Sequence, residues 1–435
     1  MVGLTYNLDK PAEDVLEVLL LGGGAGYGES VVIHFGKNKW MVVDSCVNPK
    51  TGECLPLEYL KEIGVDIAND LLFVICTHWH TDHIKGLHLL LNACSSNTTF
   101  VVAMASDRKK CLYQLYRQNE INISRDNSLI LKEIAQCFNI IEQNGIYCSQ
   151  TLQDSTIFCK NYEGTSIVCQ ALSPSQEVVK EFEREIIEAT NSYRKIAKQK
   201  DTLKKASDLI ILDANNLEED IFGELIVNTT DNILEKERVI EQEQSYWDNY
   251  NDCKAVNQNS RCITLLISIN EHHIILGSDL EVDSNSLKGW RCILERCQVI
   301  GDKKAGLFKI PHHGSDTGYL EEFILKHIKR QAISKLTTWT GGNKILPQKN
   351  MLEKYYQHSN NLFISTLRAG TKKLSSYDRQ IKKMMEDHTE FIKEEIYEAG
   401  IIRSRLKISE QDDLWNTECF GAAVKLTDKI ISGFS

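Results

Sequence analysis

Three histidines and one aspartate stand within six residues, at His78, His80, Asp82 and His83. They follow directly on Leu71–Cys76, an apolar run that predicts a buried strand. In α/β folds, ligands and catalytic groups typically stand at the carboxyl ends of such strands. Imidazole nitrogens suit zinc and related transition metals, and a carboxylate adds a harder oxygen ligand. The spacing therefore predicts a metal site; the alternative is a histidine-rich surface turn.

Two later segments repeat this arrangement of an apolar run that ends in metal-binding side chains. The run from Ile274 leads to Asp279, and the run from Leu307 leads to His312 and His313. Taken alone, Asp279 would be an ordinary turn residue at a strand end, and the histidines would be surface residues. Because the first cluster is present, we expect these segments to converge on the same site.

The run from His78 to His83 is the H-x-H-x-D-H pattern of the metallo-β-lactamase superfamily, which the chain resembles at its other strand ends as well. The resemblance implies that His78 and His80 bind one metal ion and that Asp82 and His83 bind a second. It also implies that Asp279 bridges the two ions, which a carboxylate can do because it has two oxygens.

The same resemblance assigns two further places in the site. One histidine of the pair His312 and His313 should complete the second metal site. Alignment with the superfamily's usual Gly-His-Gly favours His313, and His312 remains the alternative. Asp44 ends the expected strand Lys39–Val43, and its implied role is to hold the metal-binding loop through hydrogen bonds.

Further segments resemble one branch of the superfamily, the soluble domain of competence-type DNA-uptake channels, often called ComEC-like. They are Gly26–Ser30, Asn257–Ser260 and the His-His-Gly-Ser stretch from His312 to Ser315. The branch resemblance covers roughly residues 15–110, 130–175 and 255–366. It implies that four residues support the ligands or contact substrate: Asn257, Ser260, Lys309 and Ser315.

The chain departs from the superfamily at the third motif, which usually supplies one more histidine to the first metal. Between the first cluster and Asp279, the sequence contains only His88, His272 and His273. His88 falls inside an expected helix. His272 and His273 begin the strand that Asp279 follows, roughly 20 Å away at about 3.3 Å per residue. We therefore predict a weaker first metal site with three protein ligands.

The elements that must position these residues show the strand–helix rhythm of an α/β layered core. The superfamily resemblance implies a four-layer αβ/βα sandwich, formed by residues 1–435 as one domain. Strands are expected at Val15–Leu21, Ser30–Phe35, Lys39–Asp44, Leu71–Cys76, Phe100–Ala105, Thr156–Cys159, Ser166–Leu172, Cys262–Ile269, His273–Leu276, Gly306–Pro311, Ala332–Trp339, Gly400–Leu406 and Gly421–Leu426. Helices are expected at Leu55–Ile63, His83–Asn92, Asp126–Asn144 and Thr317–Arg330.

Two polar, helix-like stretches fall outside the resemblance, at 176–250 and 370–398. We interpret both as helical insertions carried by the core, and a coiled-coil-like arm is the alternative for the first. Such insertions would offer a docking surface to a partner protein.

The composition excludes several other classes of protein. Of the 435 residues, 42% are apolar and 25% are charged, which suits a chain with a sizeable core rather than a disordered one. The net charge of −10 leaves no surface-wide basic field for nucleic acid, although a local basic groove is compatible with it. No apolar run reaches the ~18 residues that a membrane-spanning helix needs, so no membrane contact is expected.

The 14 cysteines are scattered and contain no C-x-x-C pair. This excludes a zinc ribbon and argues against a disulfide scaffold in a chain of this length. The beginning of the chain carries acidic residues, unlike a secretory signal. We therefore expect mostly buried thiols and a cytoplasmic protein.

The resemblance implies a hydrolase with two divalent ions, Zn²⁺ or Mn²⁺, and a hydroxide that attacks phosphorus or a carbonyl carbon. Asp82 and Asp279 are the predicted catalytic residues, because they would hold ions and hydroxide in line. The branch resemblance implies phosphodiester bonds of DNA or RNA as the substrate. The alternatives are a hydrolase of small molecules, such as a cyclic nucleotide, phosphorylcholine or a lactone, and a metal-stabilised interaction module without activity.

Overall fold

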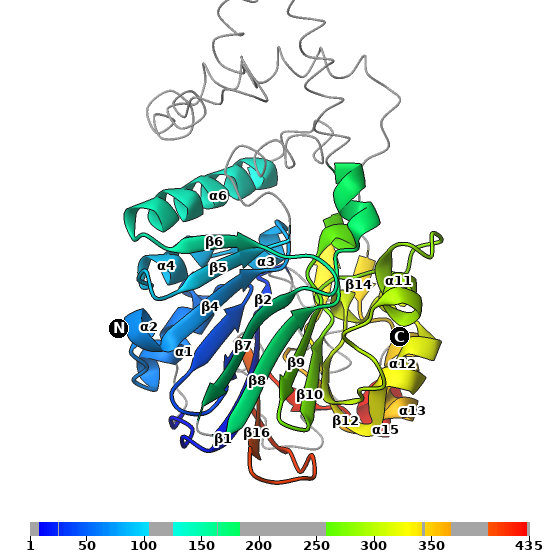
Figure 1. The fold of residues 1–435 in the computed structure, drawn as a ribbon. Helices are drawn as coiled ribbons and strands as arrows, with labels where there is room; N and C mark the ends of the chain where they lie inside the picture. The colour runs from blue at the N-terminus through cyan, green and yellow to red at the C-terminus, as the bar shows by residue number, and fades with distance from the viewer. Residues whose placement is uncertain are drawn as a thin grey trace, which may run out of the picture.

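Two mixed β-sheets face each other, and helices cover the outer face of each (Figure 1). The arrangement has four layers and agrees with the αβ/βα sandwich of the metallo-β-lactamase fold, so the predicted fold class is confirmed. The computed structural model describes residues 8–24, 26–103, 125–162, 164–182, 258–341, 344–366 and 399–432.

The first sheet has eight strands in the order β17-β16-β1-β2-β3-β4-β5-β6. The strands β3, β4, β5 and β6 are parallel neighbours, and the others pair antiparallel. The carboxyl ends of β3 and β4 therefore lie at one edge, where Asp44 and Thr77 follow them. The bounds are β1 Val15–Gly22, β2 Glu29–His34, β3 Trp40–Val43, β4 Leu71–Cys76, β5 Thr99–Val102, β6 Tyr147–Gln150, β16 Gly400–Lys407 and β17 Asn416–Gly421.

The second sheet also has eight strands, in the order β18-β15-β12-β11-β10-β9-β8-β7. Here β10, β11, β12 and β15 are parallel neighbours. Their carboxyl ends bring Asp279, His313, Thr337 and Ser365 to one edge. The bounds are β7 Thr156–Tyr162, β8 Thr165–Ala171, β9 Leu265–Ile269, β10 His272–Leu276, β11 Ala305–Lys309, β12 Ile328–Leu336, β15 Leu362–Ile364 and β18 Val424–Lys425.

The helices lie on the outer side of each sheet (Figure 1). On the first sheet they are α1 Leu55–Glu62, α2 Ile67–Asp70, α4 Leu87–Asn92 and α6 Arg125–Gln143, with α3 Thr81–Ile84 at the sheet edge. On the second they are α11 Gly289–Arg296, α12 Glu321–His327, α13 Lys349–His358 and α15 Asp428–Ser432. A hairpin of β13 Trp339–Gly341 and β14 Lys344–Leu346 follows β12.

Alternating residues of the second sheet belong to two hydrophobic cores. Ile274 and Leu307 pack into the core between the sheets, while Ile275 and Phe308 pack into the core beneath the outer helices. This is the alternation expected where successive side chains point to opposite faces and both faces are covered. Because both faces are apolar, strands of this sheet appear in the sequence as continuous apolar runs.

Some predicted elements differ from the structure. The helix expected at His83–Asn92 is divided into α3 and α4 by Gly86, whose φ of +76° is a left-handed conformation. The helix expected at Thr317–Arg330 is shorter, because the chain from Ile328 onward pairs with β11 as part of β12. The chain forms β17 and β18 in place of the strand expected at Gly421–Leu426. The short elements that were not predicted are α2, β6, α11, β13, β14, α13, β15 and α15.

Residues 176–182 are helical, as expected for the start of the first predicted insertion. The rest of that insertion and all of 370–398 lie outside the described residues. Among the described helices, none combines the length and the apolar character needed to cross a lipid bilayer.

A pair of glycines lets the first sheet approach the second beside the site. Gly22 at the end of β1 pairs with Gly400 at the start of β16. A Cβ atom on Gly400 would overlap the main-chain oxygen of Ser365, and one on Gly22 would overlap its hydroxyl. The Ser365 hydroxyl donates to Thr337 Oγ1 at 3.0 Å. Because Thr337 follows β12, the close approach of the two sheets lies beside the edge that carries the site.

The replacement Gly400→Ala should lower the free energy of unfolding by about 3 kcal/mol, because the new methyl group meets main-chain atoms that cannot rotate away. Urea denaturation measures this loss. Gly52→Ala is the control: its φ is +75° and no atom lies within 4 Å of its Cβ position, so only the backbone cost of about 1–2 kcal/mol is expected. Equal losses in the two variants would contradict the close-approach argument.

Candidate metal centre

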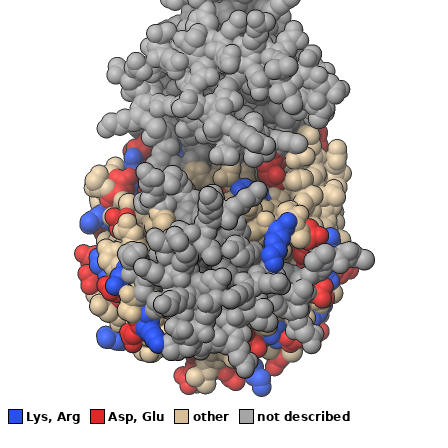
Figure 2. Space-filling model, turned by 180° about the vertical axis from the view of Figure 1, so that it is seen from behind, with Lys and Arg blue, Asp and Glu red and all other residues tan. Residues whose placement is uncertain are grey.

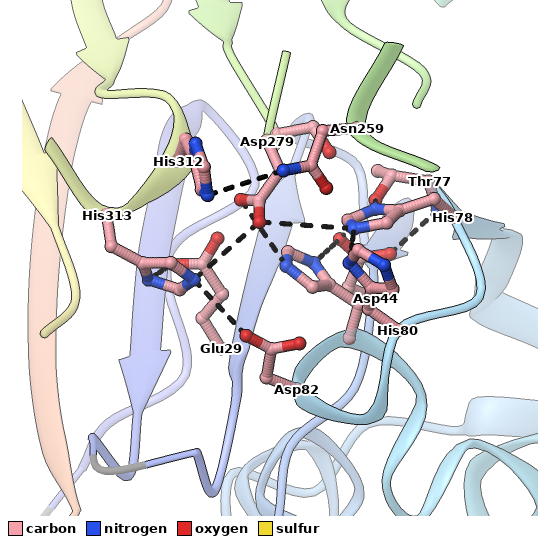
Figure 3. A network of polar contacts seen from close by, with 12 residues as sticks. Glu29, Asp44, Thr77, His78, His80, Asp82, Asn259, Asp279, His312 and His313 are labelled. Carbon is pink, nitrogen blue, oxygen red and sulfur yellow. Dashed lines mark hydrogen bonds and ion pairs between the residues drawn. The ribbon is translucent and has the colours of Figure 1, made fainter. Parts of the chain in front are cut away.

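Histidine and aspartate side chains from both sheets converge at the edge formed by their parallel strand ends (Figure 3). His78, His80 and Asp82 come from the segment after β4, Asp279 from the turn after β10, and His313 from the turn after β11. These turns are far apart in the sequence. They meet because the two sheets place their parallel strand ends at the same end of the sandwich.

Within the described part of the chain, two groups of residues could hold a metal ion, and the larger consists of the buried residues Asp82, His83, Asp279 and His313. Their ligand atoms all lie within 4.8 Å of one another. His83 Nε2 is 3.4 Å from Asp279 Oδ1, and His313 Nε2 is 3.3 Å from Asp82 Oδ2. Two imidazoles and two carboxylates around one point match the ligand preferences of a divalent transition metal.

The smaller group contains His78, His80 and again Asp279. His78 Nε2 is 2.9 Å from His80 Nδ1 and 3.9 Å from Asp279 Oδ2. Asp279 therefore faces both groups with its two oxygens. This geometry is what a carboxylate that bridges two ions requires.

Polar atoms without partners test whether the larger group fits a cation. His83 Nε2, His313 Nε2 and Asp279 Oδ1 are buried and have no hydrogen-bond partner among the described residues. Buried polar atoms are rarely left in this state unless an ion or water completes them. All three atoms belong to the same four-residue group. The donor set and its unsatisfied atoms therefore fit a divalent cation, while the kind of ion stays open.

Asp44 holds the loop after β4 in place. Its carboxylate accepts hydrogen bonds from the Thr77 main-chain nitrogen, the Thr77 hydroxyl and His83 Nδ1, each at 2.7 Å. Because the Thr77 hydroxyl donates to Asp44, its oxygen can accept a hydrogen bond from His78 Nδ1 at 3.0 Å. Both histidines are thus oriented with Nε2 toward the metal groups, as outer hydrogen bonds usually arrange for metal ligands.

A main-chain oxygen orients His313 in the same way. His313 Nδ1 donates to the Thr337 carbonyl oxygen at 3.1 Å, at the end of β12. This bond leaves Nε2 free to point at Asp82 and Asp279. A main-chain acceptor has no signature in the sequence, so sequence patterns could not identify Thr337.

Burial and neighbouring charges act in opposite directions on these groups. Burial alone would lower the pKa of His83, but Asp279 and Asp44 outweigh it and raise that pKa well above the ordinary value. Burial likewise opposes ionisation of Asp279, yet His83 and His313 hold its pKa well below the usual range. Burial, with the His83 ring nearby, lowers the pKa of His78. These effects favour the ionised form of Asp279 and the neutral form of His78, which are the forms that bind a cation.

The structure separates the two histidines that the sequence left as alternatives. His313 belongs to the four-residue group, whereas His312 belongs to neither group. His312 Nδ1 lies 2.9 Å from Glu281 Oε1, and its Nε2 lies 3.3 Å from Asn259 Nδ2. Both histidines have positive φ, +46° and +52°. Such strained backbone is characteristic of functional turns.

The remaining predicted site residues have different surroundings. Lys309 is buried and forms an ion pair with Glu29. The Ser315 hydroxyl accepts from the Thr317 main-chain nitrogen and caps a short 3₁₀ turn. Ser260 lies in the 3₁₀ turn Gln258–Arg261, and Asn257 falls outside the described residues.

Sequence analysis missed Glu29, Asn259 and Thr77 as residues of this network (Figure 3). All three stand inside or beside segments that the sequence analysis singled out, but none belongs to the histidine and aspartate pattern of the expected ligands. The sequence signal for these residues was therefore their position next to a motif. Their contacts could be identified from the structure.

The three other histidines of the intervening chain have partners elsewhere. His88 Nδ1 pairs with Glu133 at 2.7 Å, and His272 Nδ1 with Asp413 at 2.7 Å. His273 Nδ1 lies 2.9 Å from the Ser268 hydroxyl. None of them belongs to either metal group among the described residues, which agrees with a three-ligand first site.

Comparison with known proteins supports the superfamily. Residues 23–98 match the family model described as the metallo-beta-lactamase superfamily. This segment contains Asp44 and the cluster from His78 to His83, but not the ligands of the second sheet. None of the curated proteins compared with the chain matches it.

The chain also has low-scoring similarity to solved structures. The metallo-beta-lactamase fold protein YhfI from Bacillus subtilis has 11% identity and a TM-score of 0.32, with 82% of this chain and 98% of that chain covered. The hydrolase AbOPH in the beta lactamase superfamily has 14% identity and a TM-score of 0.23, with 38% and 69% covered.

Replacing the two adjacent histidines should separate their roles. His313→Gln removes a ligand and should weaken binding of one divalent ion by at least about 100-fold. His312→Gln should leave the metal affinity within about threefold of the wild type, because His312 is outside both groups. Elemental analysis and competition with a chromophoric chelator measure the two quantities. The reverse result would show that His312 is the ligand.

Metal removal should proceed in two steps. The group of His78, His80 and Asp279 has three protein ligands against four in the other group, so its ion should leave first as chelator is added. His80→Gln changes only the smaller group and should eliminate the early step, which stopped-flow release with a metal indicator would detect. Loss of the late step instead would overturn this order of affinity.

Proposed function

We propose that this protein is a metal-dependent hydrolase with two divalent ions, Zn²⁺ or Mn²⁺, at the two overlapping groups. The observation that carries the proposal is the shared position of Asp279, whose oxygens face both groups of ligands. Two ions at such a site lower the pKa of a bound water and stabilise the attacking and leaving oxygens of a displacement.

The protein's own residues prepare the site for this chemistry. Asp279 and Asp82 supply negative charge to hold the cations, and Asp82 lies at the side of the larger group nearest His313. His83 and His78 are held in orientation by Asp44 and Thr77. The burial of these groups keeps bulk water away and strengthens every charge interaction within the site.

We propose phosphodiester bonds as the substrate, with DNA or RNA as the leading source. The support is the resemblance of the Gly26–Ser30, Asn257–Ser260 and His-His-Gly-Ser segments to the ComEC-like branch. Lys and Arg side chains alternate with Asp and Glu around the described part of the rear face, and no extended basic field appears there (Figure 2).

The replacement Asp82→Asn tests the chemistry. Asn keeps the shape of the side chain but loses the charge that holds the cation and orients the nucleophile. Turnover should fall by at least ~10²–10³-fold, equivalent to ~3–4 kcal/mol of barrier, with the fold intact by circular dichroism. The assay uses a chromogenic phosphodiester with metal in excess. Equal turnover in wild type and variant would exclude a role for Asp82.

A substrate panel tests the specificity. Linear and circular DNA, RNA, a cyclic nucleotide, a chromogenic phosphodiester and a lactone are incubated with the wild type in Zn²⁺ and in Mn²⁺. Cleavage of nucleic acid supports the leading proposal. Hydrolysis confined to the small compounds supports the small-molecule alternative, and no hydrolysis at all supports an interaction module.

A further inference from the structure

A buried ion pair connects the two sheets directly behind the metal groups. Lys309 is the last residue of β11 in the second sheet, and Glu29 is the first residue of β2 in the first sheet. Their side chains form an ion pair between Nζ and Oε1, and each side chain is only 4% exposed. An unpaired charge at this depth would be strongly destabilising, so each residue requires the other.

Lys309 also holds the turn that carries Asp279. Its Nζ donates to the Ser278 carbonyl oxygen at 3.0 Å, and the His312 main-chain nitrogen donates to the same oxygen at 2.9 Å. Ser278 has a φ of +46°, a left-handed conformation that a serine rarely adopts without external support. The lysine therefore stabilises the strained residue immediately before the carboxylate shared by both metal groups.

Glu29 faces the other ligand turn. Its second oxygen, Oε2, is buried, has no hydrogen-bond partner among the described residues, and lies 3.9 Å from His313 Nδ1. Because His313 Nδ1 donates to Thr337, the negative charge of Glu29 lies beside the ring without taking its proton. The charge favours an orientation of the ring in which Nδ1–H faces Glu29 and Thr337 and Nε2 faces the metal group.

The charge of Lys309 is maintained at this depth. Burial would lower its pKa, but Glu29, Asp279 and Asp44 outweigh this effect and raise the pKa above its ordinary value. The lysine thus contributes a fixed positive charge behind several buried carboxylates.

We propose that Glu29 and Lys309 act as a positioning pair for the metal centre, fastening the Asp279 turn of the second sheet to the edge of the first sheet. Ligands contributed by the two sheets then reach the same ions. Neither residue belongs to a metal group; both act through Asp279 and His313. The inference rests on the metal binding in the proposed function, but not on hydrolysis.

The chain contains a matched control for a purely structural role. Lys335 is the register partner of Lys309 on the adjacent strand β12, and it is equally buried. Its Nζ also crosses to the first sheet, where it donates to the main-chain oxygens of Val18 at 2.7 Å and Ile402 at 3.1 Å. No described contact joins the Lys335 side chain to a metal-group residue. Burial lowers the pKa of Lys335 to about 7.

The experiment compares Lys309→Met with Lys335→Met in the full chain. Both replacements should lower the thermal stability of the metal-free protein. Only Lys309→Met should weaken Co²⁺ and Zn²⁺ binding, by about 10–100-fold as for other residues that orient metal ligands. It should also change the visible absorption spectrum of the Co²⁺-loaded protein, which reports the ligand geometry. Wild-type affinity and spectrum in Lys309→Met, or equal losses in both variants, would overturn the proposal.

A milder replacement covers the case in which Lys309→Met does not fold. Glu29→Gln keeps the volume and an acceptor for Lys309 but removes the charge beside His313. We expect a loss of Co²⁺ affinity of about 10-fold and a changed spectrum, and an unchanged affinity and spectrum would refute the role of Glu29. In the double variant of Glu29→Gln and Lys309→Met, the loss of Co²⁺ affinity should be smaller than the product of the losses in the two single variants, because the residues act as one unit.

Direct measurement of metal binding separates this inference from the proposed function. A wild-type protein that binds the ions but cleaves nothing in the substrate panel would refute the hydrolase and leave the positioning pair standing. A wild-type protein that binds no divalent ion would refute both.

Discussion

The stability of this structure depends on the groups that offset the negative charges buried where the two sheets meet. The carboxylates of Glu29, Asp44, Asp82 and Asp279 are all nearly excluded from water at this edge. Each would cost several kcal/mol if it stood there unpaired. Imidazoles and one lysine from opposite sheets offset part of that cost, and the metal groups are where compensation is incomplete. The uncompensated negative charge raises the free-energy cost of burying this region, and it also allows the region to bind cations.

Backbone conformation brings the compensating groups together. Asp44, Ser278, His312 and His313 all have positive φ, and each stands within a few residues of a strand end. These left-handed residues turn the chain sharply, so that side chains point back over the sheet edge instead of continuing along the strand. The hydrogen bonds to Asp44 and to the Ser278 carbonyl oxygen help to maintain these conformations. Left-handed backbone and buried charge therefore coincide at this edge.

Much of the architecture was predictable because each ligand segment follows an apolar strand. The continuous apolar runs at Leu71–Cys76 and from Ile274 onward are mostly buried, and their apolar composition made them recognisable. The division between α3 and α4 at Gly86 was missed, because one glycine within an apolar helical pattern does not reveal its left-handed conformation. The short strand β15 was missed because it completes the second sheet only through neighbours distant in the chain.

By itself, the sequence determined the kinds of ligand, their spacing and the strand ends that carry them, because these are properties of neighbouring residues. It also showed that the third-motif histidine is missing, since no histidine at a suitable position exists in the intervening chain. Only the tertiary structure decided that His313 faces the ligands and His312 faces Glu281, because adjacent histidines differ in the groups that the fold brings near each of them. It likewise decided the pairing of Glu29 with Lys309, residues 280 positions apart that belong to different sheets. Charge compensation between sheets acts through space, and the order of residues along the chain does not record it.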